Sequence, residues 1–175
     1  MLRKIALVLA VILAIITGLA LTKPDNYRVE RSASIKAPPE KIIGMISDFH
    51  QWSAWSPWEK IDPNMVRTFS GAPSGKGALY HWKGNSDVGE GRMEVTEVTM
   101  PTAVAIKLDF IAPFESANTT VFKLAPQGES TTVTWTMDGP MSFTTKLMSV
   151  FMSMDAMIGK DFEKGLANMK AAAEK

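Results

Sequence analysis

The sequence contains no cysteine and only two histidines among its 175 residues. Without cysteine there are no disulfide bonds, no thiolate catalysis, no Cys-based zinc site and no lipidation on cysteine. His50 and His81 alone are too few for a multi-histidine metal site. We therefore expect neither a metal site nor a bound cofactor.

An excess of either charge is also lacking, since 19 Lys and Arg stand against 18 Asp and Glu, a net charge of +1. Nucleic-acid-binding proteins usually carry a basic stripe, so we expect no nucleic-acid partner. Apolar residues make up 46% of the chain and charged residues 21%, a composition typical of a folded protein. The length fits one domain with a short extension.

One long uncharged run stands at the N-terminus. Residues 5–21 read IALVLAVILAIITGLAL, and Arg3 and Lys4 precede them. A signal-peptide core has roughly 7–15 apolar residues and a membrane-spanning helix about 17–25, so this run lies at the border. We predict that residues 1–22 are an uncleaved single-pass anchor that crosses a membrane through residues 5–21. A cleaved signal segment and a buried helix are the alternatives.

The side of the membrane on which the domain lies is not determined by the charges. Arg3 and Lys4 precede the run, while Lys23, Arg28 and Arg31 follow it closely, so counting positive charges does not favour an external domain. Whole domains often cross membranes whatever their charge, and we favour a domain outside the cytoplasm. The orientation stays open.

Residues 25–175 show the pattern of one α+β domain. Alternating side chains predict a strand over 27–36, and prolines followed by an apolar stripe predict a helix over 39–48. Short extended segments separated by Gly- and Pro-rich turns then predict an antiparallel meander. Its strands are expected at residues 66–70, 78–83, 91–99, 103–111, 118–125 and 131–138.

The last segment, residues 143–175, contains no proline, and its apolar residues recur every three or four positions from Leu147 to Met169. This periodicity predicts a long amphipathic helix of more than 20 residues. Such a helix is the obvious cover for the apolar face of a curved sheet of about seven strands. A curved sheet and one helix do not pack flush everywhere, so we expect a cavity between them.

Three segments carry a resemblance to a known superfamily. They are WSPWEKIDPN (55–64), VGEGRMEV (88–95) and KDFEKGLANMK (160–170). Together with the order of elements, they resemble the SRPBCC/START-like (helix-grip, Bet v 1-like) superfamily, and within it the membrane-anchored polyketide cyclase/dehydrase-like proteins. The resemblance implies a helix-grip fold, in which a curved antiparallel sheet wraps around a long C-terminal helix. It implies little about activity, because that superfamily hosts carriers, enzymes and interaction modules.

The candidate ligand-binding residues are the aromatic and apolar side chains expected on the inner face of the sheet, in the tryptophan-rich segment 52–64 and on the final helix. Ordinary core packing is the alternative interpretation of each of them. The set is Trp52, Trp55, Trp58, Tyr80, Trp82, Met93, Phe110, Phe122, Trp135, Met137, Phe151, Met154 and Ile158.

No residue is assigned a catalytic role. His81 has the opposite strand parity to Tyr80 and Trp82, so it should face solvent if they face the cavity. His50 adjoins the tryptophan-rich segment, and Glu115 follows a strand end and could reach a cavity mouth, but neither position requires acid–base chemistry.

We therefore expect a membrane-tethered binding protein for a small hydrophobic or amphipathic ligand, such as a lipid or a polyketide-like molecule. A cyclase/dehydrase-type enzyme and a co-chaperone-like interaction module are the alternatives. A cavity larger than about 300 Å³ would favour ligand binding over an interaction module with a filled core. The oligomeric state and the identity of the ligand are open.

Overall fold

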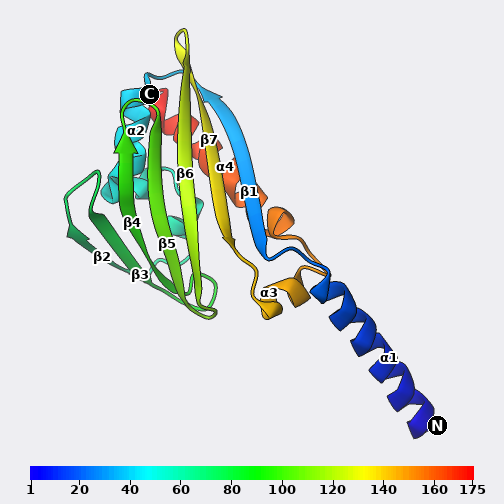
Figure 1. Cartoon of the computed structure of the whole chain (residues 1–175). Helices are drawn as coiled ribbons and strands as arrows, with labels where there is room; N and C mark the ends of the chain where they lie inside the picture. Colours follow the sequence, from blue (N-terminus) through cyan, green and yellow to red (C-terminus); the bar gives the residue numbers. More distant parts are fainter.

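Seven strands form one curved antiparallel sheet in the computed structural model, which describes residues 1–175 (Figure 1). The sheet order is β1-β7-β6-β5-β4-β3-β2, so the first strand pairs only with the last. Each predicted segment of the meander lies within an observed strand. The strands are β1 Asn26–Ile35, β2 Val66–Gly71, β3 Ala78–Lys83, β4 Glu90–Thr99, β5 Ala103–Ala112, β6 Ser116–Gln127 and β7 Ser130–Pro140.

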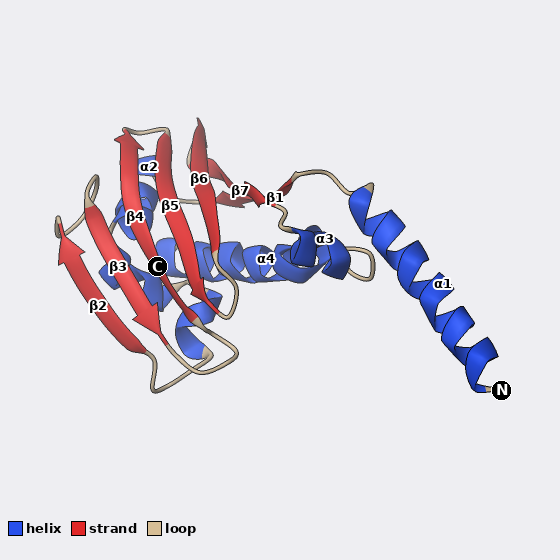
Figure 2. Cartoon of the chain, turned by 60° about the horizontal axis from the view of Figure 1, so that its bottom comes forward, coloured by secondary structure: helices blue, strands red, loops and turns tan.

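Helices cover one face of this sheet (Figures 1 and 2). The last helix lies along the sheet, and its C-terminal end meets α2, where Lys41 Nζ donates a hydrogen bond to the carbonyl of Ala173. This arrangement confirms the predicted α+β helix-grip architecture. The helical elements are α1 Leu2–Leu21, α2 Pro39–Ser47, the 3₁₀ helices η1 Phe49–Ala54 and η2 Pro57–Lys60, α3 Phe143–Met148, and α4 Met154–Ala173.

The predicted long C-terminal helix is present as α4, but it begins later than the apolar stripe from Leu147 indicated. The chain forms α3, leaves helical geometry over residues 149–153, and starts α4 at Met154. Serine side chains explain the break, because short hydroxyls favour helix ends over helix interiors. Ser153 Oγ accepts a hydrogen bond from the amide of Ala156 at 3.1 Å and so caps α4, and the Ser149 hydroxyl donates to the carbonyl of Lys146 at the end of α3.

An arginine on the inner parity of β1 joins the sheet to α4. Arg31 Nε donates to Glu163 at 2.7 Å, and its Nη1 donates to Asp155 at 2.7 Å. Gly159 leaves space for the Arg31 guanidinium, because a Cβ at position 159 would lie 2.6 Å from the guanidinium carbon. The hydrogen bond from Arg31 also holds the pKa of Asp155 below its usual value. The one charged residue of an otherwise apolar strand face is thus an attachment point for the helix.

The hydrophobic core lies between the sheet and the helices and contains 27 buried residues, all within Val29–Ala173. None of them comes from α1, so residues 24–175 bury their core without that helix. Experiments that need a soluble domain can therefore use this segment.

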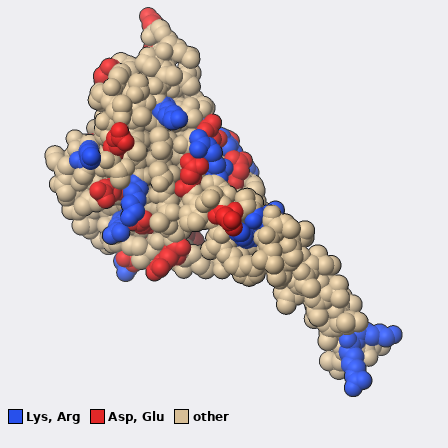
Figure 3. Space-filling model, in the orientation of Figure 1, with Lys and Arg blue, Asp and Glu red and all other residues tan.

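The N-terminal helix α1 projects away from the domain (Figure 1). It is long and apolar enough to cross a membrane, and of its residues only Ala20 is buried. In Figure 3 no Lys, Arg, Asp or Glu side chain is visible along the middle of α1, and cationic side chains lie at its N-terminal end. A membrane anchor and a cleavable signal segment share these features.

Candidate ligand pocket

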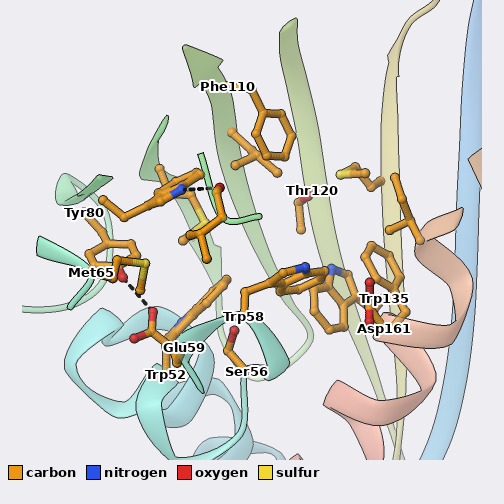
Figure 4. Close-up of a pocket in the computed structure, with 17 residues that line it drawn as sticks. Trp52, Ser56, Trp58, Glu59, Met65, Tyr80, Phe110, Thr120, Trp135 and Asp161 are labelled. Atoms are coloured by element: carbon orange, nitrogen blue, oxygen red, sulfur yellow. Dashed lines mark hydrogen bonds between the residues drawn. The ribbon is translucent and has the colours of Figure 1, made fainter. Parts of the chain in front are cut away.

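A cavity of about 160 Å³ lies between the sheet, α4 and the tryptophan-rich segment 52–64 (Figure 4). Of its 17 lining residues, 13 are hydrophobic, and they come from η1, η2, five strands, α4 and the connecting segments between them. They are Trp52, Ser56, Trp58, Glu59, Met65, Tyr80, Trp82, Val88, Met93, Leu108, Phe110, Thr120, Trp135, Met137, Ile158, Asp161 and Phe162.

Nine of the thirteen predicted residues line this cavity. They are Trp52, Trp58, Tyr80, Trp82, Met93, Phe110, Trp135, Met137 and Ile158. The six of them that lie on strands converge because of strand parity, since every second residue of each strand faces the helix.

The other four predicted residues do not line the cavity. Trp55 and Phe122 are fully buried in the core, where the two rings meet edge to face at 6.0 Å. Met154 packs, partly buried, against the core. Phe151 is 74% exposed, because it falls in the break between α3 and α4 that the helical periodicity concealed.

Eight lining residues were missed by the sequence prediction. Three of them had a usable signal, because Phe162 belongs to the apolar stripe of the last helix, Leu108 shares the strand parity of Phe110, and Thr120 shares that of Phe122. The other polar members, Ser56, Glu59 and Asp161, lie outside the strands and had none. The eight are Ser56, Glu59, Met65, Val88, Leu108, Thr120, Asp161 and Phe162.

The tryptophan-rich segment is held by the end of α2. The last carbonyls of a helix have no partner within it and need donors from elsewhere. Trp52 Nε1 donates to the carbonyl of Ile46 at 2.9 Å, and Trp55 Nε1 donates to that of Met45 at 3.1 Å. Two of the three tryptophans thus satisfy a helix end, while the third, Trp58, meets Trp135 edge to face at 5.8 Å.

A glycine in β4, within the segment VGEGRMEV, shapes the part of the cavity wall that Trp82 forms. Gly91 sits at a register shift in β4, and a Cβ there would overlap the indole ring of Trp82. The missing side chain lets that ring lie close over β4, and Trp82 Nε1 donates to the carbonyl of Val88 at 3.3 Å. A side chain at position 91 would therefore displace the Trp82 ring from its place in the wall.

One end of the cavity is a closed polar cluster (Figure 4). The Tyr80 hydroxyl donates to Glu59 Oε1 at 2.6 Å, and Arg67 Nε donates to Glu59 Oε2 at 2.7 Å. Burial, and then the hydrogen bond to Glu59, raise the pKa of Tyr80, so it remains a neutral phenol. The same carboxylate raises the pKa of Arg67. Both Glu59 oxygens are occupied and its side chain is only 7% exposed, an arrangement that ties η2 to β2 and β3.

The histidines and Glu115 lie outside the cavity. His81 faces outward, as its parity predicted, with Nε2 3.2 Å from Glu90. His50 and Glu115 are exposed. No group of three or more His, Asp or Glu side chains is placed to hold a metal ion.

The cavity opens at the end of the sheet nearest α1. Val88 lies in the turn after β3 and Phe110 near the end of β5, and both strand ends lie on the side where β1 begins. Apart from Glu59 in the closed polar cluster, the half-buried lining residues are Trp58, Val88, Leu108, Phe110, Ile158 and Asp161.

The chain matches a known family. The family described as polyketide cyclase / dehydrase and lipid transport matches residues 27–174. None of the curated proteins compared matches the chain.

Solved structures share the fold at low sequence identity. Major latex-like protein 151 from Panax ginseng is 15% identical, with a TM-score of 0.62 over 86% of this chain and 99% of that one. Protein CV1439 from Chromobacterium violaceum is 15% identical, with a TM-score of 0.59 over 87% of this chain and 99% of that one. The Aha1 dimer from Colwellia psychrerythraea is 18% identical, with a TM-score of 0.57 over 85% of this chain and 96% of that one. At these identities the likeness shows the fold alone.

Proposed function

We propose that this chain, which belongs to the polyketide cyclase/dehydrase and lipid transport family, is a membrane-tethered binding protein for a small hydrophobic or amphipathic ligand. The observation that supports this function is the cavity itself. It is partly open, and 13 of its 17 lining residues are hydrophobic. An apolar pocket with a few polar groups is the usual form of a small-molecule site.

The volume limits the size of the ligand. At about 160 Å³ the cavity falls below the roughly 300 Å³ expected of a pocket for a drug-sized ligand, so the size criterion is not met. It is close to the roughly 150 Å³ of an engineered apolar cavity that binds benzene. Met65, Met93 and Met137 line the walls, and methionine side chains adapt readily. We therefore expect one ring, or the end of a chain, to enter the cavity.

Binding is tested with purified residues 24–175 and three probes: toluene, 1-octanol and a short-chain quinone. Burial of apolar probe surface should raise the melting temperature, and the rise should increase with probe concentration because only the folded state binds. Lipid or other small molecules co-extracted from the purified protein would be identified by mass spectrometry. If no probe changes the melting temperature and nothing is co-extracted, ligand binding is contradicted.

The membrane tether is supported by α1 and by the surface beside it. The C-terminal end of α1 lies next to α3 (Figure 2). Large apolar side chains are exposed on α3 and on the segment after it: Phe143, Met148, Phe151 and Met152. Exposed apolar side chains gathered beside a spanning helix fit a surface that rests on lipid.

We expect the full chain to stay in the membrane fraction after a high-salt wash, and residues 24–175 to remain in the supernatant. The intact mass of the membrane-bound protein should include residues 1–22, because an anchor is not cleaved. A mature protein that lacks these residues would identify a signal segment instead.

The protein-interaction module keeps one observation in its favour, which is the small volume of the cavity. That function predicts no response to any probe and a partner protein recovered by cross-linking. The cyclase/dehydrase-type alternative gains no support from His81 or Glu115, because neither lines the cavity.

A further inference from the structure

Two polar atoms in the wall of the cavity have no hydrogen-bond partner. They are the hydroxyl of Thr120 on β6 and the indole N–H of Trp135 on β7. Both residues line the cavity, and their exposed fractions are only 3% and 2%. A buried polar group without a partner destabilises a protein, so such a group in a native fold calls for an explanation.

Three of the four other tryptophans differ from Trp135. The indole N–H groups of Trp52, Trp55 and Trp82 all donate to backbone carbonyls at 2.9 to 3.3 Å. Trp58 makes no such hydrogen bond but is only half-buried, so Trp135 is the one buried indole N–H without a partner.

The sheet register brings Thr120 and Trp135 together. Thr120 pairs with Met137, and Phe122 pairs with Trp135, so Thr120 and Trp135 are diagonal neighbours on the inner face. Diagonal neighbours have Cβ atoms about 7–8 Å apart or somewhat less, within reach of a long aromatic side chain. Figure 4 shows Thr120 above the indole rings of Trp58 and Trp135.

The chemistry of the pair selects a neutral acceptor. An indole N–H can only donate, and a hydroxyl can donate as well, so an oxygen with two lone pairs satisfies both. The only charged lining residues are Glu59 and Asp161, both acidic. With no cation in the wall, a carboxylate or phosphate group is disfavoured there.

We propose that Thr120 and Trp135 form a polar subsite that binds the carbonyl oxygen of a neutral, otherwise apolar ligand, such as a ketone, a quinone or an ester. This inference rests on the proposed function, because it needs a ligand in the cavity. A site that hydrogen-bonds a ligand group discriminates against an analogue that lacks it.

Two probes of the same shape test the subsite on residues 24–175. Acetophenone carries a carbonyl, and α-methylstyrene replaces that oxygen with a methylene. In ¹H–¹⁵N spectra the five tryptophans give five indole cross-peaks, and the Trp135→Phe variant identifies the one from Trp135. Acetophenone should move that indole proton downfield, whereas the hydrocarbon should produce only the ring-current shift common to both probes.

The variant Thr120→Val removes the hydroxyl and keeps the shape. We expect it to weaken acetophenone binding about 5–10-fold while leaving α-methylstyrene binding unchanged or stronger. Thr119→Val is the matched control, because Thr119 is the exposed neighbour on the same strand and should change neither affinity.

The outcomes separate the two proposals. If both probes bind but Thr120→Val changes their affinities equally, or the Trp135 signal responds identically to both, the subsite is overturned and the binding function stands. If neither probe binds the unaltered protein, the binding function itself fails and the subsite with it.

Discussion

Replacing Leu108 by tryptophan is expected to weaken the binding of toluene, 1-octanol and the quinone at least 100-fold while leaving the domain folded. Leu108 lines the cavity from β5 and is half-buried near its opening. An indole at this position would occupy much of the about 160 Å³ that a ligand needs. Overpacking a filled core costs about 1–3 kcal/mol, and a cavity rim should cost less because the larger ring has space to enter.

The control for Leu108→Trp is Lys107→Trp, one residue earlier on the same strand. Lys107 is exposed on the outer face, where its ammonium lies 3.2 Å from Asp109. Loss of this surface ion pair should cost about 0–1 kcal/mol and should not alter affinity. Titration calorimetry and thermal melts measure both properties. If Leu108→Trp binds every probe as tightly as the unaltered chain, the cavity is not the binding site.

The sheet could be predicted from sequence because its signals are local and repeated. Gly- and Pro-rich turns separate segments such as 103–111, in which Ile106, Leu108 and Phe110 alternate with Lys107 and Asp109. Alternation fixes which side chains face the helix before any coordinates are known. Most of the predicted cavity residues on the strands follow from this single rule.

The final helix shows where local signals end. Leu147, Phe151 and Met154 keep helical spacing, yet the backbone leaves helical geometry between Met148 and Met154. The capping serines Ser149 and Ser153 outweigh the spacing, and apolar periodicity carries no information about capping. Phe151 was predicted to bind ligand on the basis of a helix turn that does not form.

The polar groups of the site depend on contacts between distant segments. Glu59 lies 21 residues from Tyr80 in sequence, and their hydrogen bond exists because η2 folds against β3. Thr120 is one of many threonines in the sheet, and only the three-dimensional arrangement shows that its hydroxyl has no partner. Sequence patterns can identify a face of an element, but they do not show which polar atoms on it remain unpaired.

Replacing Phe162 by alanine is expected to lower the free energy of unfolding by about 3–5 kcal/mol. Phe162 is 1% exposed, and its ring stacks on Trp135 with centroids 4.0 Å apart and 10° between the planes. It also meets Trp58 edge to face at 6.3 Å. Removing the ring therefore takes away apolar burial and aromatic contacts at the point where α4 meets the sheet.

The same substitution enlarges the cavity, because Phe162 is part of its wall. Toluene should therefore raise the melting temperature of Phe162→Ala more than that of the unaltered protein, since a dry apolar cavity binds a small aromatic molecule. Urea unfolding of residues 24–175 gives the loss of stability. Phe114→Ala is the control, because Phe114 is 63% exposed and its change should lie within about 0.5 kcal/mol. A loss below about 1 kcal/mol for Phe162→Ala, with no gain in the response to toluene, would mean that α4 does not close the cavity through this ring.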